Sequence, residues 1–284
     1  MSDTTQAPFT ARDGLNLALY DWPLPSRQRP RGVVLIVHGL GEHAWRHHAL
    51  AHQLNDWGFV VRAYDQRGHG DSGGAPGVLP DDDALLDDLE EVLDDTRRHL
   101  AEPWACPLIL LGHSMGGLVS AAFVQRGIAR VDALVLSSPA FDTGLSAFKR
   151  ALIGLMLRLA PDRTLSNGLN PDKLSHKAAV VQAYRRDRRV HDRISARLAR
   201  FIDEHGPLVR QAAPQWRVPT LLLFAGNDRL VNPAGSVAFA EAAPPQVVSA
   251  RRFDALYHEI FNEADNAAVF DTLRQWLDRR APAA

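Results

Sequence analysis

The feature that most restricts the fold of this chain is an alternation of short apolar runs with longer segments of helical periodicity. The run Val33–Val37 is apolar at every position, and so is the run Leu108–Leu111. A strand that is apolar on both sides must be covered on both faces, as the strands of parallel sheets are. Segments such as 81–100 carry leucines at helical spacing between these strands. The alternation predicts an α/β fold with a mostly parallel central sheet and helices on both faces.

The individual elements can be predicted as residue ranges. We expect strands at Val33–Val37, Phe59–Tyr64, Leu108–Leu111, Ala133–Leu136, Thr220–Phe224 and, at a sheet edge, Val247–Arg252. We expect helices at Ala49–Trp57, Asp81–Leu100, Met115–Gln125, Pro233–Ala242 and Asn262–Arg279. The segments Phe9–Arg12 and Leu15–Asp21 favour an antiparallel hairpin that adds to the sheet at its edge.

One stretch, from about residue 142 to residue 213, interrupts the alternation. It contains no strand pattern, and its helical segments are separated by Pro161, Gly168, Pro171 and Pro207. The stretch is too long for an ordinary connection and must have structure of its own. We therefore predict a core formed by residues 1–141 and 214–284, with residues 142–213 inserted as a helical cap.

Charge and composition exclude several classes of protein. The net charge of −1 argues against a nucleic-acid-binding protein. The single cysteine, Cys106, excludes an intramolecular disulfide and fits a reducing compartment. Met1–Thr10 lacks the apolar segment of a secretory signal, and no apolar run is long enough to span a bilayer. We expect a cytoplasmic protein.

Ser114 lies at the centre of Gly112-His113-Ser114-Met115-Gly116, which matches the motif G-x-S-x-G. The motif follows a predicted strand and precedes a predicted helix, and in that context it presents a reactive serine. A tight turn exposes the hydroxyl, and glycines at 112 and 116 remove side chains that would collide there. The pattern predicts Ser114 as a nucleophile, with a glycine turn around a buried serine as the simpler alternative.

A serine hydroxyl needs a base and an acid before it can attack. On a fold of this kind the chain order is serine, acid, histidine. Asp228 follows the strand predicted at Thr220–Phe224, where the carboxyl end of a parallel strand reaches the functional edge of the sheet. His258 follows the last predicted strand, and the other eleven histidines all precede Asp228. We therefore predict Ser114, Asp228 and His258 as the catalytic residues.

The reaction also requires two backbone N–H groups to stabilise the negative charge on oxygen. One is expected from Met115, which follows the nucleophile. The other is expected from the loop His38-Gly39-Leu40-Gly41, where we assign it to Leu40.

Other polar clusters are given simpler interpretations. His47, His48 and His52 lie on one segment, but no third ligand in a zinc-binding pattern accompanies them, so we predict neither a metal nor a cofactor. The glycine-rich segment Asp65–Ser72 is interpreted as a loop tied down by hydrogen bonds, and His113 as a structural residue.

Several motifs together resemble monoacylglycerol lipases and related lysophospholipase-like enzymes of the α/β-hydrolase superfamily. They are Val37–His43, Asp65–Ser72, Gly112–Gly117, Asp228–Val231, Tyr257–Glu259 and, in the cap, Asn170–Ser175 and Tyr184–Asp187. The resemblance implies the same triad and the same oxyanion amides as above. It also implies a cap over an apolar acyl tunnel, with Tyr184 facing the alcohol end of the substrate. The run Arg185–Arg189 is more basic than the family pattern.

The function predicted is hydrolysis of carboxylic esters, most specifically of a monoacylglycerol to glycerol and a fatty acid, through an acyl-enzyme on Ser114. A general carboxylesterase and a lysophospholipase use the same machinery and stay open. A non-enzymatic ligand-binding protein on this fold would require an incomplete triad, and here all three members are present. The expected partner is a small lipid ester, and the sequence assigns no oligomeric state.

The cap has a basic and partly apolar composition. From Leu145 to Ala213 it holds 14 basic and 6 acidic residues, and seven large apolar side chains crowd 148–159. The simpler interpretation is a helix packed on the core. The alternative is a partly exposed apolar lid helix that admits acyl chains or contacts membranes or lipid aggregates peripherally.

Overall fold

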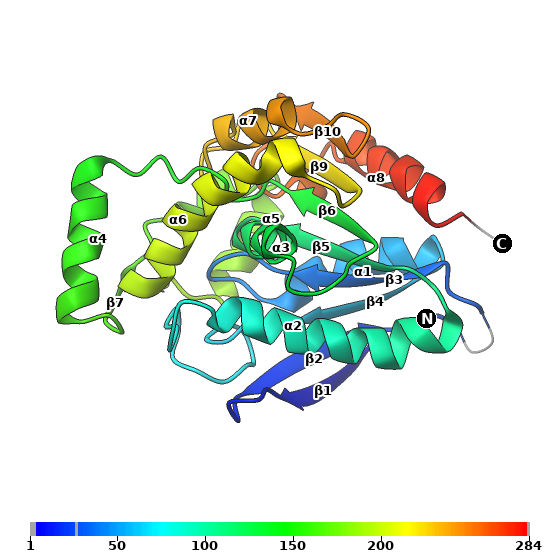
Figure 1. Cartoon of the computed structure of the whole chain (residues 1–284), viewed down its shortest axis with the longest axis horizontal. Coiled ribbons are helices and arrows are strands. Elements are labelled where there is room, and N and C mark those ends of the chain that lie inside the picture. The colour runs from blue at the N-terminus through cyan, green and yellow to red at the C-terminus, as the bar shows by residue number, and fades with distance from the viewer. Residues whose placement is uncertain (1–3, 26–27, 283–284) are drawn as a thin grey trace.

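The computed structural model describes residues 4–25 and 28–282. In this part of the chain, eight strands form one sheet in the order β1-β2-β4-β3-β5-β6-β9-β10 (Figure 1). The strands are β1 (Thr5–Thr10), β2 (Asn16–Trp22), β3 (Gly32–Val37), β4 (Phe59–Tyr64), β5 (Leu108–His113), β6 (Ala133–Ser137), β9 (Thr220–Ala225) and β10 (Val248–Phe253). Pairing is parallel from β4 to β10 and antiparallel in β1–β2 and β2–β4. The predicted sheet, its edge strand and its antiparallel hairpin are confirmed, but the first hairpin strand, predicted at Phe9–Arg12, lies at Thr5–Thr10.

Helices cover both faces of the sheet, as the apolar strands require. Val33 and Leu35 of β3 pack into one hydrophobic core, and Val34 and Ile36 pack into the other. The first core is covered by α2 (Ala84–Thr96), α3 (Met115–Arg126) and α7 (Ala234–Ala242). The second is covered by α1 (His48–Asp56) and α8 (Ala267–Arg280). The predicted three-layer arrangement is confirmed.

Two predicted helices differ from the structure at their ends. The helix predicted at Asp81–Leu100 begins at Ala84, and after Thr96 it widens into a π-helical turn, Arg97–Ala101. The closing helix was predicted from Asn262, but a separate short turn, Ile260–Asn262, precedes α8, which starts only at Ala267. Helix ends depend on local capping and tertiary contacts that periodicity does not report.

Residues 142–213 contain α4 (Ala147–Leu159), α5 (Ala178–Arg186) and α6 (Ala196–Ala212). They also contain β7 (Thr164–Ser166) and β8 (Arg193–Ser195), which pair with each other antiparallel. The prediction that this stretch holds no strand is therefore wrong. Each strand has only three residues, which is too short to show an alternating pattern, and their partners are far apart in the chain.

Helix α4 stands apart from the sheet. In Figure 1 it forms one end of the molecule, and α6 leads from it back to the core. None of the residues of α4 is fully buried, but the helix packs against α6 and lines the cavity with Leu152, Ile153 and Met156. It therefore packs on the insert rather than on the sheet, and both interpretations of this segment stay open. Helix α6, in contrast, packs Leu198, Phe201 and Val209 into the first hydrophobic core. The division into a core and a cap at residues 142 and 213 stays a prediction.

The parallel strands place the residues of interest at one edge of the sheet. The loop 38–41 follows β3, Ser114 follows β5, Asp228 follows β9 and His258 follows β10. Because carboxyl ends of parallel strands meet at the same edge, these loops converge.

No helix in the described residues is both long and apolar enough to cross a membrane. The prediction that no secretory signal is present concerns Met1–Thr10, whose first three residues lie outside the described part of the chain.

Candidate active site

Ser114 occupies a strained turn between β5 and α3. Its backbone angles are φ 53° and ψ −119°, which a residue with a side chain rarely adopts. A Cβ atom on Gly116 would lie 2.2 Å from the carbonyl oxygen of Val37, and one on Gly112 would lie 2.4 Å from that of Gly116. The turn can therefore form only with glycine at both positions, and it exposes the Ser114 side chain to a cavity.

Asp228 and His258 form a buried pair. The Asp228 Oδ2 atom lies 2.6 Å from His258 Nδ1, and both side chains are less than 5% exposed. Asp228 Oδ1 accepts the N–H groups of Leu230 and Val231 at 2.9 and 3.0 Å. The loops after β9 and β10 bring the two side chains together because these strands are parallel neighbours.

Asp228 and His258 each shift the pKa of the other. Burial alone would raise the pKa of Asp228, but the neighbouring His258 and the two backbone donors hold the pKa below its ordinary value. Burial alone would lower the pKa of His258, but the Asp228 carboxylate raises the pKa above its ordinary value. His258 therefore gains basicity from Asp228, as a general base requires.

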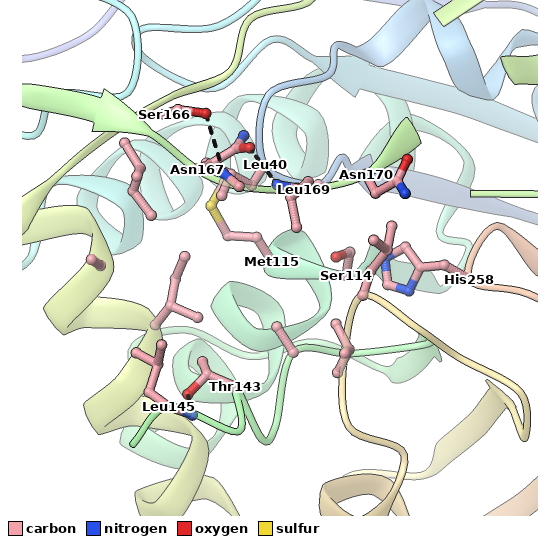
Figure 2. A pocket seen from close by; sticks show the side chains of 18 of the residues that line it. Leu40, Ser114, Met115, Thr143, Leu145, Ser166, Asn167, Leu169, Asn170 and His258 are labelled. Carbon is pink, nitrogen blue, oxygen red and sulfur yellow. Dashed lines mark hydrogen bonds between the residues drawn. The ribbon is translucent and has the colours of Figure 1, made fainter. Parts of the chain in front are cut away.

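Ser114 and His258 line the same cavity, and Figure 2 shows both side chains at one end of it. The Ser114 hydroxyl has no hydrogen-bond partner among the described residues, and such contacts often tighten only when substrate binds. The ring of His113 lies 4.9 Å from that of His258. Burial lowers the pKa of His113 to about 3, so this second imidazole stays neutral. His113 also bonds to Ser137 Oγ at 3.1 Å, in keeping with a structural role.

Leu40 and Met115 also line the cavity beside Ser114 (Figure 2). Met115 is the first residue of α3, so its N–H has no partner within the helix. In the described part of the chain, no protein group accepts the N–H of Leu40 or of Met115. Two unpaired backbone donors next to a serine hydroxyl can stabilise an oxyanion.

The loop that carries Leu40 is fixed by a buried carboxylate. Glu42 Oε1 accepts the N–H of Gly39 at 2.6 Å. Burial would raise the pKa of Glu42, but His47, His113 and Arg46 hold the pKa well below its ordinary value. Glu42 is therefore charged at neutral pH.

Glu42 belongs to a polar cluster that the sequence analysis missed. Arg46 donates to Glu42 at 3.0 Å and also to Glu259, and its guanidinium lies over the ring of Tyr184 at 4.8 Å. Glu42, Tyr184 and Glu259 line the cavity. The sequence offered one signal, because Glu42 and Arg46 are spaced four residues apart with opposite charge. Tyr184, predicted to face the alcohol end of a substrate, lies in this cluster.

The cavity has a volume of about 610 Å³. Away from the polar cluster its wall is mainly apolar and comes largely from the insert, including Leu145, Leu152, Ile153, Met156, Leu165 and Ile194. The apolar side chains Leu152, Ile153 and Met156 come from α4, whereas Tyr184 comes from α5 and contacts Arg46 of the polar cluster. A substrate with one apolar and one polar part matches this division.

The remaining histidine and aspartate clusters have structural partners. His48 accepts a bond from Trp22 at 3.0 Å and contacts the ring of His52. Within the described residues, no group of three or more His, Cys, Asp or Glu side chains is arranged to hold a metal ion. Asp65 accepts the N–H groups of Ala44 and Asp71, both at 2.7 Å, so the loop that starts there is tied down by hydrogen bonds.

A serine on a strand-to-helix turn, beside a buried Asp–His pair at the carboxyl edge of this sheet, is the arrangement that defines an α/β hydrolase. The chain belongs to the family described as serine aminopeptidase, S33, whose model matches residues 28–265. The fold and the class of hydrolase predicted from the sequence are thereby confirmed.

Three comparisons show what the chain is similar to. A monoacylglycerol lipase of Mycolicibacterium smegmatis is 34% identical over 97% of this chain and 98% of its own length. A phospholipase of Bacillus subtilis is 29% identical over 88% of this chain and 96% of its own length. The crystal structure of a monoacylglycerol lipase from Paleococcus ferrophilus matches with a TM-score of 0.81 and 31% identity, over 93% of this chain and 99% of that one.

Proposed function

We propose that this protein hydrolyses monoacylglycerols to glycerol and a fatty acid. The observation that carries the proposal is the division of the cavity around Ser114. Its apolar wall, from the insert, suits an acyl chain, and the cluster of Glu42, Tyr184 and Glu259 suits a small polyol. The similarity to two monoacylglycerol lipases supports the same substrate class.

The mechanism proposed is acyl transfer through Ser114. His258 accepts the hydroxyl proton while Ser114 Oγ attacks the ester carbonyl carbon. The carbonyl oxygen becomes an oxyanion, which the N–H groups of Leu40 and Met115 stabilise. Asp228 orients His258 and stabilises its cation. His258 then protonates the departing glycerol oxygen as the bond to the acyl carbon breaks. A water molecule then attacks the acyl carbon while His258 accepts its proton. The bond between the acyl carbon and Ser114 Oγ breaks, Ser114 recovers the proton from His258, and the fatty acid is released.

The charge of the polar cluster favours an uncharged leaving group. Glu42 and Glu259 share Arg46, so the cluster presents two carboxylates and one guanidinium. Carboxylate oxygens accept hydrogen bonds from glycerol hydroxyls, whereas a phosphate in the same place would be repelled. At the cluster itself this balance favours monoacylglycerol over a lysophospholipid, although Lys149 and Arg229 also line the cavity and the chain is also similar to a phospholipase.

A substrate panel tests the proposal. We expect kcat/KM to be larger for monoacylglycerols of medium or long chain than for acetate esters and for lysophospholipids of the same acyl length. Each CH₂ group of the substrate that is buried against the apolar wall contributes about 0.8 kcal/mol to the free energy of binding, which favours the longer chains over acetate. A preference for acetate esters would make the protein a general esterase, and a preference for lysophospholipids would contradict the assignment of the polar cluster.

We further propose that α4 contacts lipid surfaces. Phe148, Leu155 and Leu159 are 78%, 53% and 75% exposed, and Lys149 and Arg158 lie on the same helix. Exposed apolar side chains insert into the interfacial region of a bilayer, and each well-placed cation adds about 1 kcal/mol on an anionic surface.

Flotation with vesicles tests the contact. We expect the protein to float with anionic vesicles at low salt, and the double variant Phe148→Ser, Leu159→Ser to float much less. The variant Trp104→Ser serves as control, because Trp104 is an exposed apolar residue outside the insert. Equal flotation of all three proteins, or none at low salt, would rule out this contact.

A further inference from the structure

The carboxylate of Glu263 lies between the loop that carries His258 and the insert. Its side chain is 1% exposed. Glu263 Oε1 accepts the Tyr257 N–H and bonds to His176 Nδ1, both at 2.8 Å. Its Oε2 accepts the Ser175 hydroxyl at 3.1 Å and the His176 N–H at 3.0 Å. All of these donors belong to the residue that precedes His258 or to the insert.

The backbone is held on both sides of His258. The N–H of Tyr257 is held by Glu263, and the N–H of Glu259 donates to the Leu174 carbonyl at 2.8 Å. One carboxylate and one short segment of the insert, 174–176, therefore hold the peptide group between His258 and Glu259 and the one between Leu256 and Tyr257. The imidazole must face Asp228 with one nitrogen and the Ser114 hydroxyl with the other, and small errors of placement are costly in such an arrangement.

The same contacts fix the wall of the cavity. Segment 174–176 follows the cavity-lining Asn170 and leads directly into α5, which carries Tyr184. The His176 ring also stacks on the ring of Tyr257, with 3.6 Å between centroids. The insert and the His258 loop are thus joined at one point, where Glu263 lies between them.

A carboxylate is needed at this point. Both of its oxygens accept hydrogen bonds, so it can satisfy all of these donors, whereas an amide has only one oxygen and would turn an NH₂ group toward the other donors. Burial would raise the pKa of Glu263, but the Tyr257 N–H and the bonds from His176 hold the pKa below its ordinary value. The side chain is therefore an anion that its donors stabilise.

We infer that Glu263 is a positioning residue, which aligns His258 for proton transfer and sets the insert against it. It acts through His258 and does not line the cavity. The inference rests on the role proposed above for His258 as the general base.

The test compares Glu263→Gln with a matched control, Asp88→Asn. Asp88 is also a buried carboxylate, which accepts Arg67 Nε at 2.6 Å, but it lies in α2 away from the cavity. Both variants are assayed where circular dichroism shows them to be folded, with p-nitrophenyl butyrate as substrate. We expect Glu263→Gln to lower kcat by about 10- to 100-fold with KM changed by less than about twofold. The rate at which a fluorophosphonate labels Ser114 should fall by a similar factor, and Asp88→Asn should change neither.

Two further variants keep the test decisive. His176→Ala removes one donor to Glu263, and because the His176 side chain is itself half-exposed, this variant should fold even if Glu263→Gln does not. We expect it to lower kcat by a smaller factor, again with little change in KM. His258→Ala separates the two claims, because it should be inactive if His258 is the base. If His258→Ala is inactive while Glu263→Gln and His176→Ala both behave like Asp88→Asn, the inference about Glu263 is wrong. If His258→Ala keeps its activity, the proposed mechanism itself fails.

Discussion

Replacing Ser114 with alanine is expected to lower kcat by about 10⁶-fold, because removal of the nucleophile leaves only substrate binding and oxyanion stabilisation. The fold should survive. Alanine retains the Cβ atom, and the Ser114 hydroxyl makes no hydrogen bond with a described residue that the change would break. The variant should therefore melt at a temperature close to that of the unmodified protein. The measurement is hydrolysis of a medium-chain monoacylglycerol, together with thermal unfolding followed by circular dichroism.

The control for this variant is another serine in a strained conformation. Ser138 has φ 42° in the loop that follows β6 and is buried, but it does not line the cavity. We expect Ser138→Ala to retain most of the activity. If Ser114→Ala also retained substantial activity, Ser114 would not be the nucleophile.

The second large effect is expected for Asp228→Asn, which should lower kcat by about 10⁴-fold. The asparagine amide can turn its NH₂ group toward His258 Nδ1, which stabilises the wrong tautomer of the imidazole and leaves its other nitrogen unable to accept the Ser114 proton. The backbone donors Leu230 and Val231 can still bond to the amide oxygen, so the loop should keep its shape.

The pH dependence supplies a separate check of the same pair. His258 must be neutral to accept a proton, so activity should fall as the pH decreases through its pKa. Because Asp228 raises that pKa, the acid limb of kcat/KM in the unmodified enzyme should have its midpoint above 6.5. In Asp228→Asn, burial lowers the pKa of His258 with less opposition, although the nearby Glu42 and Glu259 still raise it. The residual activity should then persist to lower pH. An acid limb that stays in place would show that Asp228 does not set the basicity of His258.

The sheet could be predicted from the sequence because its central strands are apolar on both sides. Val33–Val37 and Leu108–Leu111 leave no alternative to burial between two layers, and the strands begin within one residue of the predicted positions. The turn at Ser114 was predictable for a related reason. Only glycine fits at 112 and 116, because other parts of the backbone lie too close for a side chain there. The two glycines of the motif therefore indicate this turn from the sequence alone.

The insert was less predictable because its structure depends on contacts between distant residues. The strands β7 and β8 pair residues about thirty positions apart, and three-residue strands carry no pattern of their own. The exposure of Phe148 and Leu159 was equally hidden, since an apolar helix has the same sequence whether it faces a core or solvent. The polar partners Arg46–Glu259 and His176–Glu263 join loops that only the folded chain brings together.

The most direct test of the account is to locate the reactive residue by mass spectrometry. The protein is labelled with a fluorophosphonate, the modified peptide is identified after proteolysis, and monoacylglycerol hydrolysis is measured in parallel samples. Our account predicts a single adduct on Ser114, with hydrolysis lost in proportion to the fraction labelled. An adduct on another residue, or hydrolysis that continues after Ser114 is fully labelled, would contradict it.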